Sequence, residues 1–332
     1  MVMGEVWDYT LKQQENMSFK VKDFVQKQGL TLEGTTEWTV SLEDEENRIV
    51  ATASRHRNVL KFFAVEPSHI GEGLLAKVLS PLITQAIQAG FPRLFLFTKP
   101  KYKAQFKPFG FYVLAETEDA LLMENSSDGL DTYLRDLRAL APPQANRIGV
   151  IVANCNPFTL GHRYLMEEGS KRCDFLYVFI LSSEESMFSA SSRLALAQEG
   201  TADLENVVVL SSSDYFVSPA TFPTYFLPNR DQIQQAGCAL DLVLFCNRIA
   251  PALHISIRFV GTEPISALTD SYNMQMKEML PKHGIEVVEI PRLKVGEQVV
   301  SASLVRAYLA RGEKEKLKEL VPSTTYSLLE KM

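Results

Sequence analysis

Two short clusters of hydroxyl, imidazole and guanidinium side chains are the residues best suited to chemistry in this chain. In the first cluster, Thr159 and His162 belong to the string Thr-Leu-Gly-His, which follows an apolar run. In the second, Ser301 and Ser303 come just before Arg306. All three kinds of group hydrogen-bond to phosphate oxygens. The two clusters therefore predict a site that holds phosphate groups.

The residues around the first cluster predict the element that positions it. The apolar run 148–153 is typical of a buried strand, Pro157 marks a loop, and the pattern over 163–172 is typical of a helix. Helix starts bind phosphates because unpaired backbone N–H groups and the helix dipole face the ligand. We therefore expect a phosphate-binding strand–loop–helix unit here.

Two further segments are expected to complete this site. Arg193 follows a serine-rich stretch, and its guanidinium is long enough to reach a phosphate. Gly261, Thr262 and Glu263 form a turn at the end of another apolar segment. In a sheet of parallel strands, such turns lie at the edge where ligands bind. We therefore expect these residues to join the two clusters.

Length, composition and charge limit what the protein can be. Its 332 residues suggest about two domains, and 46% hydrophobic with 22% charged residues is ordinary for a soluble globular chain. A net charge of −6 argues against a broad nucleic-acid footprint. No apolar run approaches the roughly 18 residues that cross a membrane. We therefore predict a cytoplasmic protein without a nucleic-acid or membrane partner.

The four cysteines and five histidines give no sign of a protein-bound metal. None of the cysteines forms a Cys-x-x-Cys pair, and no His/Cys cluster has zinc-ligand spacing. Reduced cysteines agree with a cytoplasmic location. Cys155 lies in the predicted phosphate loop, but no neighbour in sequence would activate it as a nucleophile, so we expect it to pack in the core.

Pro142 and Pro143 mark the best domain boundary, because two prolines stop a helix that arrives over 130–140. We predict a first domain over 1–140, a linker over 141–146 and a second domain over 147–332.

The two predicted domains differ in their segment patterns. The first has short strand candidates, a hairpin turn and one long helix, which indicates an α+β fold. These segments are strands at 37–42, 48–53, 59–65 and 94–97, and a helix at 74–89. The second alternates solid apolar runs with helical stretches, which indicates a Rossmann-like α/β fold with a parallel sheet. Its strand candidates are 148–153, 175–181, 207–210, 242–245, 257–260 and 287–290.

The two clusters resemble the signatures of the (His/Thr)-x-Gly-His nucleotidyltransferase superfamily. The resemblance implies that the first motif grips a triphosphate and stabilises the transition state at the α-phosphorus, while the second binds the end that leaves as pyrophosphate. Catalysis would come from positioning and charge rather than from a protein nucleophile. It implies a catalytic role for His162 and Thr159, and ATP binding by Asn154, Asn156, Gly161, Arg193, Gly261, Thr262, Glu263, Ser301, Ser303 and Arg306. Mg²⁺ is expected to arrive with ATP.

Three further strings, 218–227, 259–264 and 269–273, resemble the [citrate (pro-3S)-lyase] ligase family, and this resemblance covers essentially the whole chain. It implies that ATP activates acetate as acetyl-adenylate with release of pyrophosphate. The acetyl group would then pass to the thiol of the dephospho-CoA-like prosthetic group on the acyl carrier subunit of citrate lyase.

The segment from Ser68 to Gly73 resembles the pyrophosphate loop of Gcn5-related N-acetyltransferases, and 106–112 resembles a segment near the end of that fold. Ser68 departs from the family pattern, in which this position is Gln or Arg. The resemblance implies an acetyltransferase-like (GNAT) fold rather than acetyltransferase catalysis. We expect Gly71 and Gly73 to dock the CoA-like arm of the carrier.

Other interpretations of these residues remain open at this point. His162 would alone be a capping or core histidine, Ser301 and Ser303 suit helix N-caps, and Arg193 suits a solvent-facing position. A nucleotidyltransferase that acts on a phosphorylated small molecule, such as phosphopantetheine, would use the same Thr159 and His162 chemistry. A non-catalytic nucleotide- or CoA-binding protein is a third possibility.

Overall fold

The computed structural model describes residues 9–32, 34–182, 186–216, 225–227, 230–263 and 267–331. By its contacts the chain forms two compact units, and neither is one continuous stretch. The first comprises 1–129 and 222–243, and the second comprises 130–221 and 244–332. The linker expected at 141–146 falls within the range of the second unit. The division into folding domains stays a prediction, which limited proteolysis would test.

The first unit is built on a mixed sheet with the strand order β1-β2-β3-β4-β5-β7-β6. Strands β4 and β5 are parallel, whereas the other neighbours are antiparallel. Helix α2 buries Leu74, Val78 and Leu82 in the core beneath the sheet. The elements are β1 Thr10–Glu15, α1 Phe19–Lys27, β2 Trp38–Glu43, β3 Ile49–His56, β4 Val59–Val65, α2 Leu74–Gln88, β5 Phe95–Thr98, α3 Lys103–Phe106, β6 Tyr112–Glu116 and β7 Leu121–Glu124, with short 3-10 turns at Pro67–His69, Pro100–Tyr102 and Lys107–Phe109.

This architecture confirms the α+β fold expected for the first half, and its acetyltransferase-like character stays a prediction. Each strand predicted there is present within a few residues, and the acidic turn before β3 closes an antiparallel hairpin with β2. The structure adds β1, β6 and β7, whose segments were not predicted as strands.

Tyr225 gives a physical role to part of the string 218–227, of which only 225–227 are described. The Tyr225 side chain is buried, and its hydroxyl donates to the Phe97 carbonyl at 2.7 Å. Its own carbonyl accepts from the Thr31 backbone N–H at 2.9 Å, and its ring lies 4.8 Å from that of Phe62. A residue that sequence places in the second half therefore packs in the first unit.

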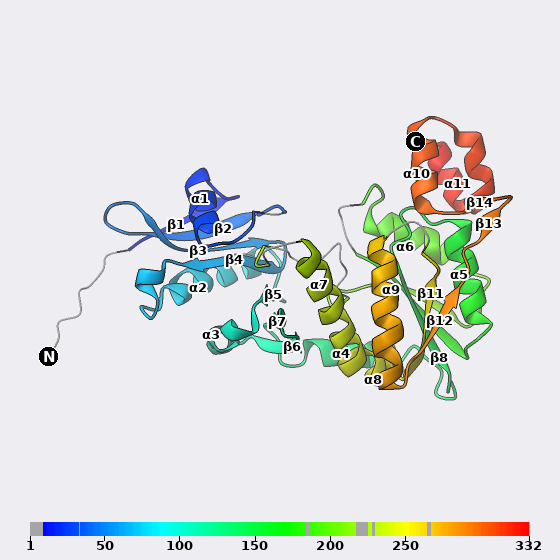
Figure 1. Cartoon of the computed structure of the whole chain (residues 1–332), viewed down its shortest axis with the longest axis horizontal. Coiled ribbons are helices and arrows are strands. Elements are labelled where there is room, and N and C mark those ends of the chain that lie inside the picture. Colours follow the sequence, from blue (N-terminus) through cyan, green and yellow to red (C-terminus); the bar gives the residue numbers. More distant parts are fainter. Residues whose placement is uncertain are drawn as a thin grey trace. The chain divides into compact units, whose positions relative to one another are not determined.

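The second unit contains a five-stranded parallel sheet with the order β10-β9-β8-β11-β12. Helices α5 and α6 pack on one face, and α9 lies on the other (Figure 1). The elements are α4 Gly129–Arg138, β8 Ile148–Ala153, α5 Leu160–Ser170, β9 Phe175–Ile180, α6 Ala190–Glu199, β10 Val207–Ser211, α7 Arg230–Leu244 (which begins in the first unit), a π-helical turn Phe245–Ile249, α8 Ala250–Leu253, β11 Ile255–Gly261, α9 Ala267–Met279, a 3-10 turn Leu280–His283, β12 Glu286–Ile290, β13 Lys294–Val295, β14 Gln298–Val299, α10 Ala302–Ala310, a 3-10 helix Lys314–Glu319 and α11 Ser323–Glu330.

The connections of this sheet create a switch point between β8 and β11. The chain runs outward from β8 through β9 to β10, and it then returns to place β11 on the other side of β8. Pairing between β8 and β11 ends at Val150 and Arg258. Ligands of such sheets bind in the crevice beyond the strand ends at the switch point.

One strand prediction in the second half is wrong. Residues 242–245 are helical, at the end of α7 and the start of the π-helical turn. Leu242, Leu244 and Phe245 are fully buried. A short apolar run in a fully buried helix has the same sequence pattern as a buried strand, so periodicity alone does not separate the two. The other five strand predictions are confirmed within two residues.

Among the described residues, one helical stretch, Gln235–Leu253, has the length and mean hydropathy of a membrane span. The stretch reaches the hydropathy of a membrane span only as an average over its residues, because polar and charged residues interrupt its apolar sequence. In that window 67% of the residues are buried inside the protein, as in a core helix. This helix is therefore weak evidence for a membrane segment.

Candidate functional site

The loop between β8 and α5 is held by buried side chains on both sides of its turn. Cys155 and Phe158 are fully buried, and Cys155 adopts the left-handed backbone conformation with φ of +50°. Burial raises the pKa of the Cys155 thiol well above its ordinary value. Cys155 therefore packs in the core, as expected, and the loop presents the residues that follow it.

Thr159 and His162 form a reciprocal cap at the start of α5. The Thr159 hydroxyl accepts from the His162 backbone N–H at 3.3 Å, and the His162 Nδ1 accepts from the Thr159 backbone N–H at 3.1 Å. A backbone N–H only donates, so Nδ1 carries no proton. The proton of the neutral ring is therefore on Nε2, which is left to donate to a ligand.

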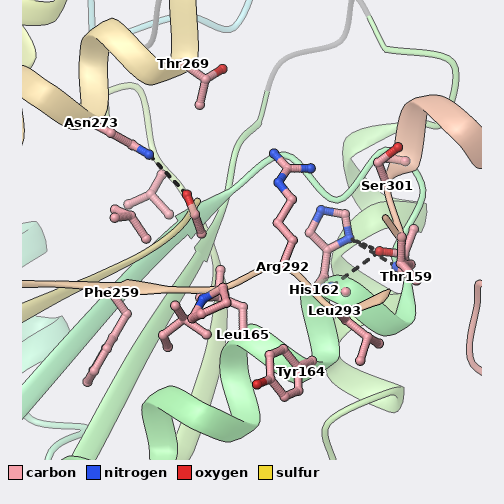
Figure 2. Close-up of a pocket in the computed structure, with 18 of the residues that line it drawn as sticks. Thr159, His162, Tyr164, Leu165, Phe259, Thr269, Asn273, Arg292, Leu293 and Ser301 are labelled. Carbon is pink, nitrogen blue, oxygen red and sulfur yellow. Dashed lines mark hydrogen bonds between the residues drawn. The ribbon is translucent and has the colours of Figure 1, made fainter. Parts of the chain in front are cut away.

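The electrostatic surroundings keep this imidazole neutral. Burial, followed by the charge of the Arg292 guanidinium, lowers the pKa of His162 from 6.5 to about 4. Figure 2 shows the His162 ring between Thr159 and Arg292, with Ser301 on the same side of the cavity. At neutral pH the His162 ring is therefore a neutral N–H donor beside the fixed positive charge of Arg292.

Arg292 was not predicted from the sequence. It follows β12, and its Nε donates to the Thr262 carbonyl at 2.6 Å while its guanidinium pairs with the Glu263 carboxylate. Its backbone N–H donates to the Thr262 hydroxyl at 3.2 Å. Thr262 and Glu263, expected to bind ATP, thus hold Arg292 in place. A cation directly after the last apolar strand was the available signal, since strand ends gather at one edge.

The second motif lies against the first. Ser301 is the N-cap of α10, where its hydroxyl accepts from the Leu304 backbone N–H at 3.2 Å. Arg306 donates to the Asn156 carbonyl in the first loop and, at 3.1 Å, to the Ser303 hydroxyl. Two segments 150 residues apart in sequence are thus joined by one guanidinium.

Gly161 lies where the two motifs come close together. A Cβ atom at this position would lie 3.1 Å from the Val300 carbonyl oxygen, which is tighter than ordinary van der Waals contact. Because the neighbouring atom is backbone, relief would need the start of α10 to move away from α5. The glycine in Thr-x-Gly-His therefore allows the two helix starts to converge.

The converging helix starts and strand ends enclose a cavity of about 210 Å³. It lies at the switch point, where the N-termini of α5 and α10 provide partial positive charge and N–H donors. Asn273, on α9, borders the cavity and donates to the Gly261 carbonyl at 3.1 Å (Figure 2). The predicted site residues in the lining are Thr159, Gly161, His162, Gly261 and Ser301, joined by Arg292.

Seven predicted ligands of ATP are absent from the cavity lining, and three of them, Arg193, Asn154 and Asn156, belong to one hydrogen-bonded group around the first loop. Arg193 is fully buried, so it does not face solvent, and it donates to the carbonyls of Leu181 and Phe188 and to Asn154. Asn156 accepts from the Phe188 backbone N–H at 3.2 Å. In the structure these residues brace the loop. Direct ATP binding by Arg193, Asn154, Asn156, Thr262, Glu263, Ser303 and Arg306 stays a prediction.

The glycine loop of the first unit offers a different set of groups. Gly73 is the N-cap of α2, with φ of +73° and no side-chain cap, and Gly71 has φ of +101°. Ile70 is exposed, and Glu72 accepts from the Tyr9 hydroxyl. The loop therefore offers mainly backbone groups at a helix start. Docking of a CoA-like arm at Gly71 and Gly73 stays a prediction.

Comparison with known proteins places this site in a family context. Residues 148–329 match the family model described as the citrate lyase ligase C-terminal domain. The chain is 41% identical over 311 residues to the [citrate [pro-3S]-lyase] ligase of Klebsiella pneumoniae, which covers 92% of this chain and 90% of that protein. It is 38% identical over 319 residues to the enzyme of the same name from Haemophilus influenzae, with 94% of each chain covered.

Among solved structures, Thermotoga maritima TmcAL bound with alpha-thio ATP aligns with 56% of this chain and 55% of its own, at 13% identity and a TM-score of 0.34.

Proposed function

We infer the function of this protein from one premise, which is that the chain belongs to the citrate lyase ligase family. We propose that it activates acetate with ATP, forms acetyl-adenylate and releases pyrophosphate. The acetyl group then passes to the thiol of a CoA-like prosthetic group on the acyl carrier subunit of citrate lyase. The protein is thus an AMP-forming acid–thiol ligase.

The observation that carries this proposal is a neutral His162 with its Nε2 proton directed away from the cap, beside Arg292 in the cavity. In the first step a carboxylate oxygen attacks the α-phosphorus, and the bond from that phosphorus to the bridging oxygen breaks. The electron pair leaves with pyrophosphate. Negative charge builds on the phosphoryl oxygens, where a donor and a fixed cation stabilise the transition state.

A neutral imidazole is the form that suits this step. The attacking carboxylate has no proton to lose, so the step needs no general base. An N–H donor fixed by the Thr159 cap can hydrogen-bond to the α-phosphoryl oxygens without reorganisation. The positive charge beside the imidazole comes instead from Arg292. In the second step the carrier thiol loses its proton and attacks the acetyl carbon, and AMP leaves.

The start of α10 is suited to the end of the triphosphate that departs. Ser301 lines the cavity at this helix start, where the dipole favours negative charge. The described residues contain no group of three or more His, Cys, Asp or Glu that could hold a metal ion. Mg²⁺ bound to the phosphates of ATP would supply further charge neutralisation there.

The first unit is proposed to bring the acceptor thiol. An acetyltransferase-like unit with a glycine turn at the start of α2 presents backbone N–H groups that suit the phosphates of a CoA-like arm. In this proposal the second unit makes acetyl-adenylate and the first unit docks the arm. The cytoplasmic location of the protein is part of the same proposal, since the four cysteines are unpaired thiols.

The proposal is tested by exchange of labelled pyrophosphate into ATP with Mg²⁺ present. Exchange that requires acetate supports it. Exchange that requires a phosphorylated alcohol such as phosphopantetheine, and not acetate, would instead identify a nucleotidyltransferase. Binding of ATP without any exchange would identify a nucleotide-binding protein that does not turn over.

A further inference from the structure

A buried arginine, Arg258, borders the cavity and has no role in the proposed phosphoryl chemistry of His162 and Arg292. It lies in β11 and is only 4% exposed, yet it belongs to the cavity lining. It also lies at the last pair between β11 and β8, opposite Val150, where the pairing of the two strands ends. Arg258 therefore lies at the inner end of the switch-point crevice.

The charge of Arg258 lacks an anionic partner in the described part of the chain. Its guanidinium lies 4.8 Å from the ring centroid of Phe245, and its Nε is buried without a hydrogen-bond partner. An arginine side chain stays protonated in proteins. A buried charge is costly unless it is paired and hydrogen-bonded, and an aromatic ring does not replace those hydrogen bonds.

The other arginines near the site show what a satisfied guanidinium looks like in this protein. Arg292 pairs with Glu263 and the Thr262 carbonyl. Arg193 donates to several carbonyl oxygens of the loop and strand ends. Arg258 is 4% exposed, against 0% for Arg193, but it lacks such partners in the described residues, and it borders the cavity. Its missing partner is therefore best supplied by an anionic ligand.

The lining near Arg258 indicates which anion this is. Val152 on β8, Val260 two residues along β11 and Met276 on α9 give this part of the cavity an apolar wall. Phosphates are better served at the helix starts of α5 and α10, with their dipoles and hydroxyls. A guanidinium in the same cavity lining as these apolar side chains suits a carboxylate with a short apolar tail.

We propose that Arg258 binds the carboxylate of the acid substrate, a small aliphatic monocarboxylate, and so positions it for attack on the α-phosphorus. The proposal rests on the proposed function, and it adds the residue that recognises the acid. Each carboxylate oxygen has two lone pairs, so an oxygen held by the guanidinium retains one for the phosphorus. Arg258 and His162 line the same cavity of about 210 Å³, so an acid bound at Arg258 lies in the same cavity as His162.

The test measures acetate and ATP dependence of pyrophosphate exchange separately, in the full-length protein. Arg258→Met should raise the KM for acetate about 10- to 100-fold, the loss expected for a charged hydrogen-bonded pair, and leave the KM for ATP within about threefold. Arg248→Met is the matched control, because Arg248 pairs with Asp131 outside the cavity. An unchanged acetate KM in Arg258→Met, or an equal rise in the KM for ATP, would overturn the proposal.

Two further measurements cover the case in which Arg258→Met does not fold. Arg258→Lys keeps the charge but loses the planar fork, and it should still raise the acetate KM. Acetate should raise the thermal unfolding temperature of the wild-type protein and have a smaller effect on Arg258→Lys. Equal effects would overturn the proposal. If the wild-type protein shows no acetate-dependent exchange, the proposed function itself fails, and that outcome is distinct from a normal acetate KM in the variants.

Discussion

The loop before α2 in the first unit and the loop before α5 in the second share one local plan, a strand followed by a turn and a helix start. They differ in what caps the helix. Helix α2 starts at Gly73 in a left-handed conformation with no side-chain cap, whereas α5 starts at Thr159 with a reciprocal cap from His162. The first loop offers backbone groups, and the second adds a positioned imidazole.

The difference shows how one plan serves two purposes. Backbone N–H groups and a helix dipole are enough to hold an anion, so the loop before α2 suits a docking role. Chemistry at phosphorus also needs groups aimed at the charge that develops, and these come to the second loop from elsewhere in the chain. Arg292 reaches it from β12 and Ser301 from α10.

Replacing His162 is expected to have the largest effect, because this imidazole is what distinguishes the loop before α5 from the loop before α2. His162→Ala should lower the rate of acetate-dependent exchange about 100- to 1,000-fold, because one fixed donor to the transition state is lost. His283→Ala, which changes an exposed histidine of the same unit, is the control and should keep the wild-type exchange rate. A His162→Ala protein that keeps more than a tenth of the exchange rate would remove this histidine from the reaction.

Arg292 tests whether the second loop depends on a distant strand end. Arg292→Gln should lower exchange about 30- to 100-fold through the loss of charge stabilisation. It should also raise the pKa of His162, since the guanidinium now lowers it. Kinetics and an NMR titration of the His162 ring check the two effects. Lys294→Gln, at an exposed position nearby, should change neither.

Gly161 tests the close approach that joins the two motifs. Gly161→Ala should destabilise the protein by about 1–3 kcal/mol, because the new methyl group meets the Val300 carbonyl. Gly261→Ala is the matched control, since nothing lies within 4 Å of a Cβ there. Urea unfolding measures both changes. Equal free energies of unfolding for the two variants would show that the starts of α5 and α10 can move apart at little cost.

Acid should weaken the second unit through His162. The pKa of this histidine is about 4 when folded and 6.5 ordinarily, so the unfolded chain binds the proton more readily. Stability is therefore lost as pH falls from 6.5 toward 4. Between pH 7 and 5 the wild-type protein should lose on the order of 1–2 kcal/mol more than His162→Gln in urea unfolding. Equal losses of unfolding free energy in the wild-type protein and His162→Gln would contradict the lowered pKa of His162.

The docking role of the first loop has the smallest expected effect. Gly73→Val should spare exchange but slow acetyl transfer to the carrier about three- to tenfold, because a side chain at the start of α2 obstructs the arm. Gly90→Val carries a similar backbone strain, with φ of +90°, at the other end of the helix. Normal transfer by Gly73→Val would reject docking at this loop.

Much of the fold was predictable because it is encoded locally. Apolar runs and turn residues predicted most strands of both units. The failures have physical causes. Residues 242–245 are as apolar as a buried strand but lie in a buried helix. Strand β1, with a mostly exposed burial pattern, offers no apolar alternation that would reveal it.

The candidate site was predicted in part for a similar reason. Thr159, Gly161, His162 and Ser301 line the cavity because both motifs begin helices, and capping residues are visible in sequence. Arg193 has the residue type of a phosphate ligand, yet its guanidinium braces the loop from inside the core. Residue type does not reveal which carbonyls surround a side chain.

The sequence by itself determined the two helix caps, the apolar segments that become parallel strands and the chemistry expected of a Thr-x-Gly-His motif, because these depend on neighbours within a few residues. Only the tertiary structure decided the rest. It placed Arg292 beside His162, joined Arg306 to the first loop and left Arg258 facing the cavity. Charges act across space rather than along the chain, so their roles follow from which strand ends meet at the switch point.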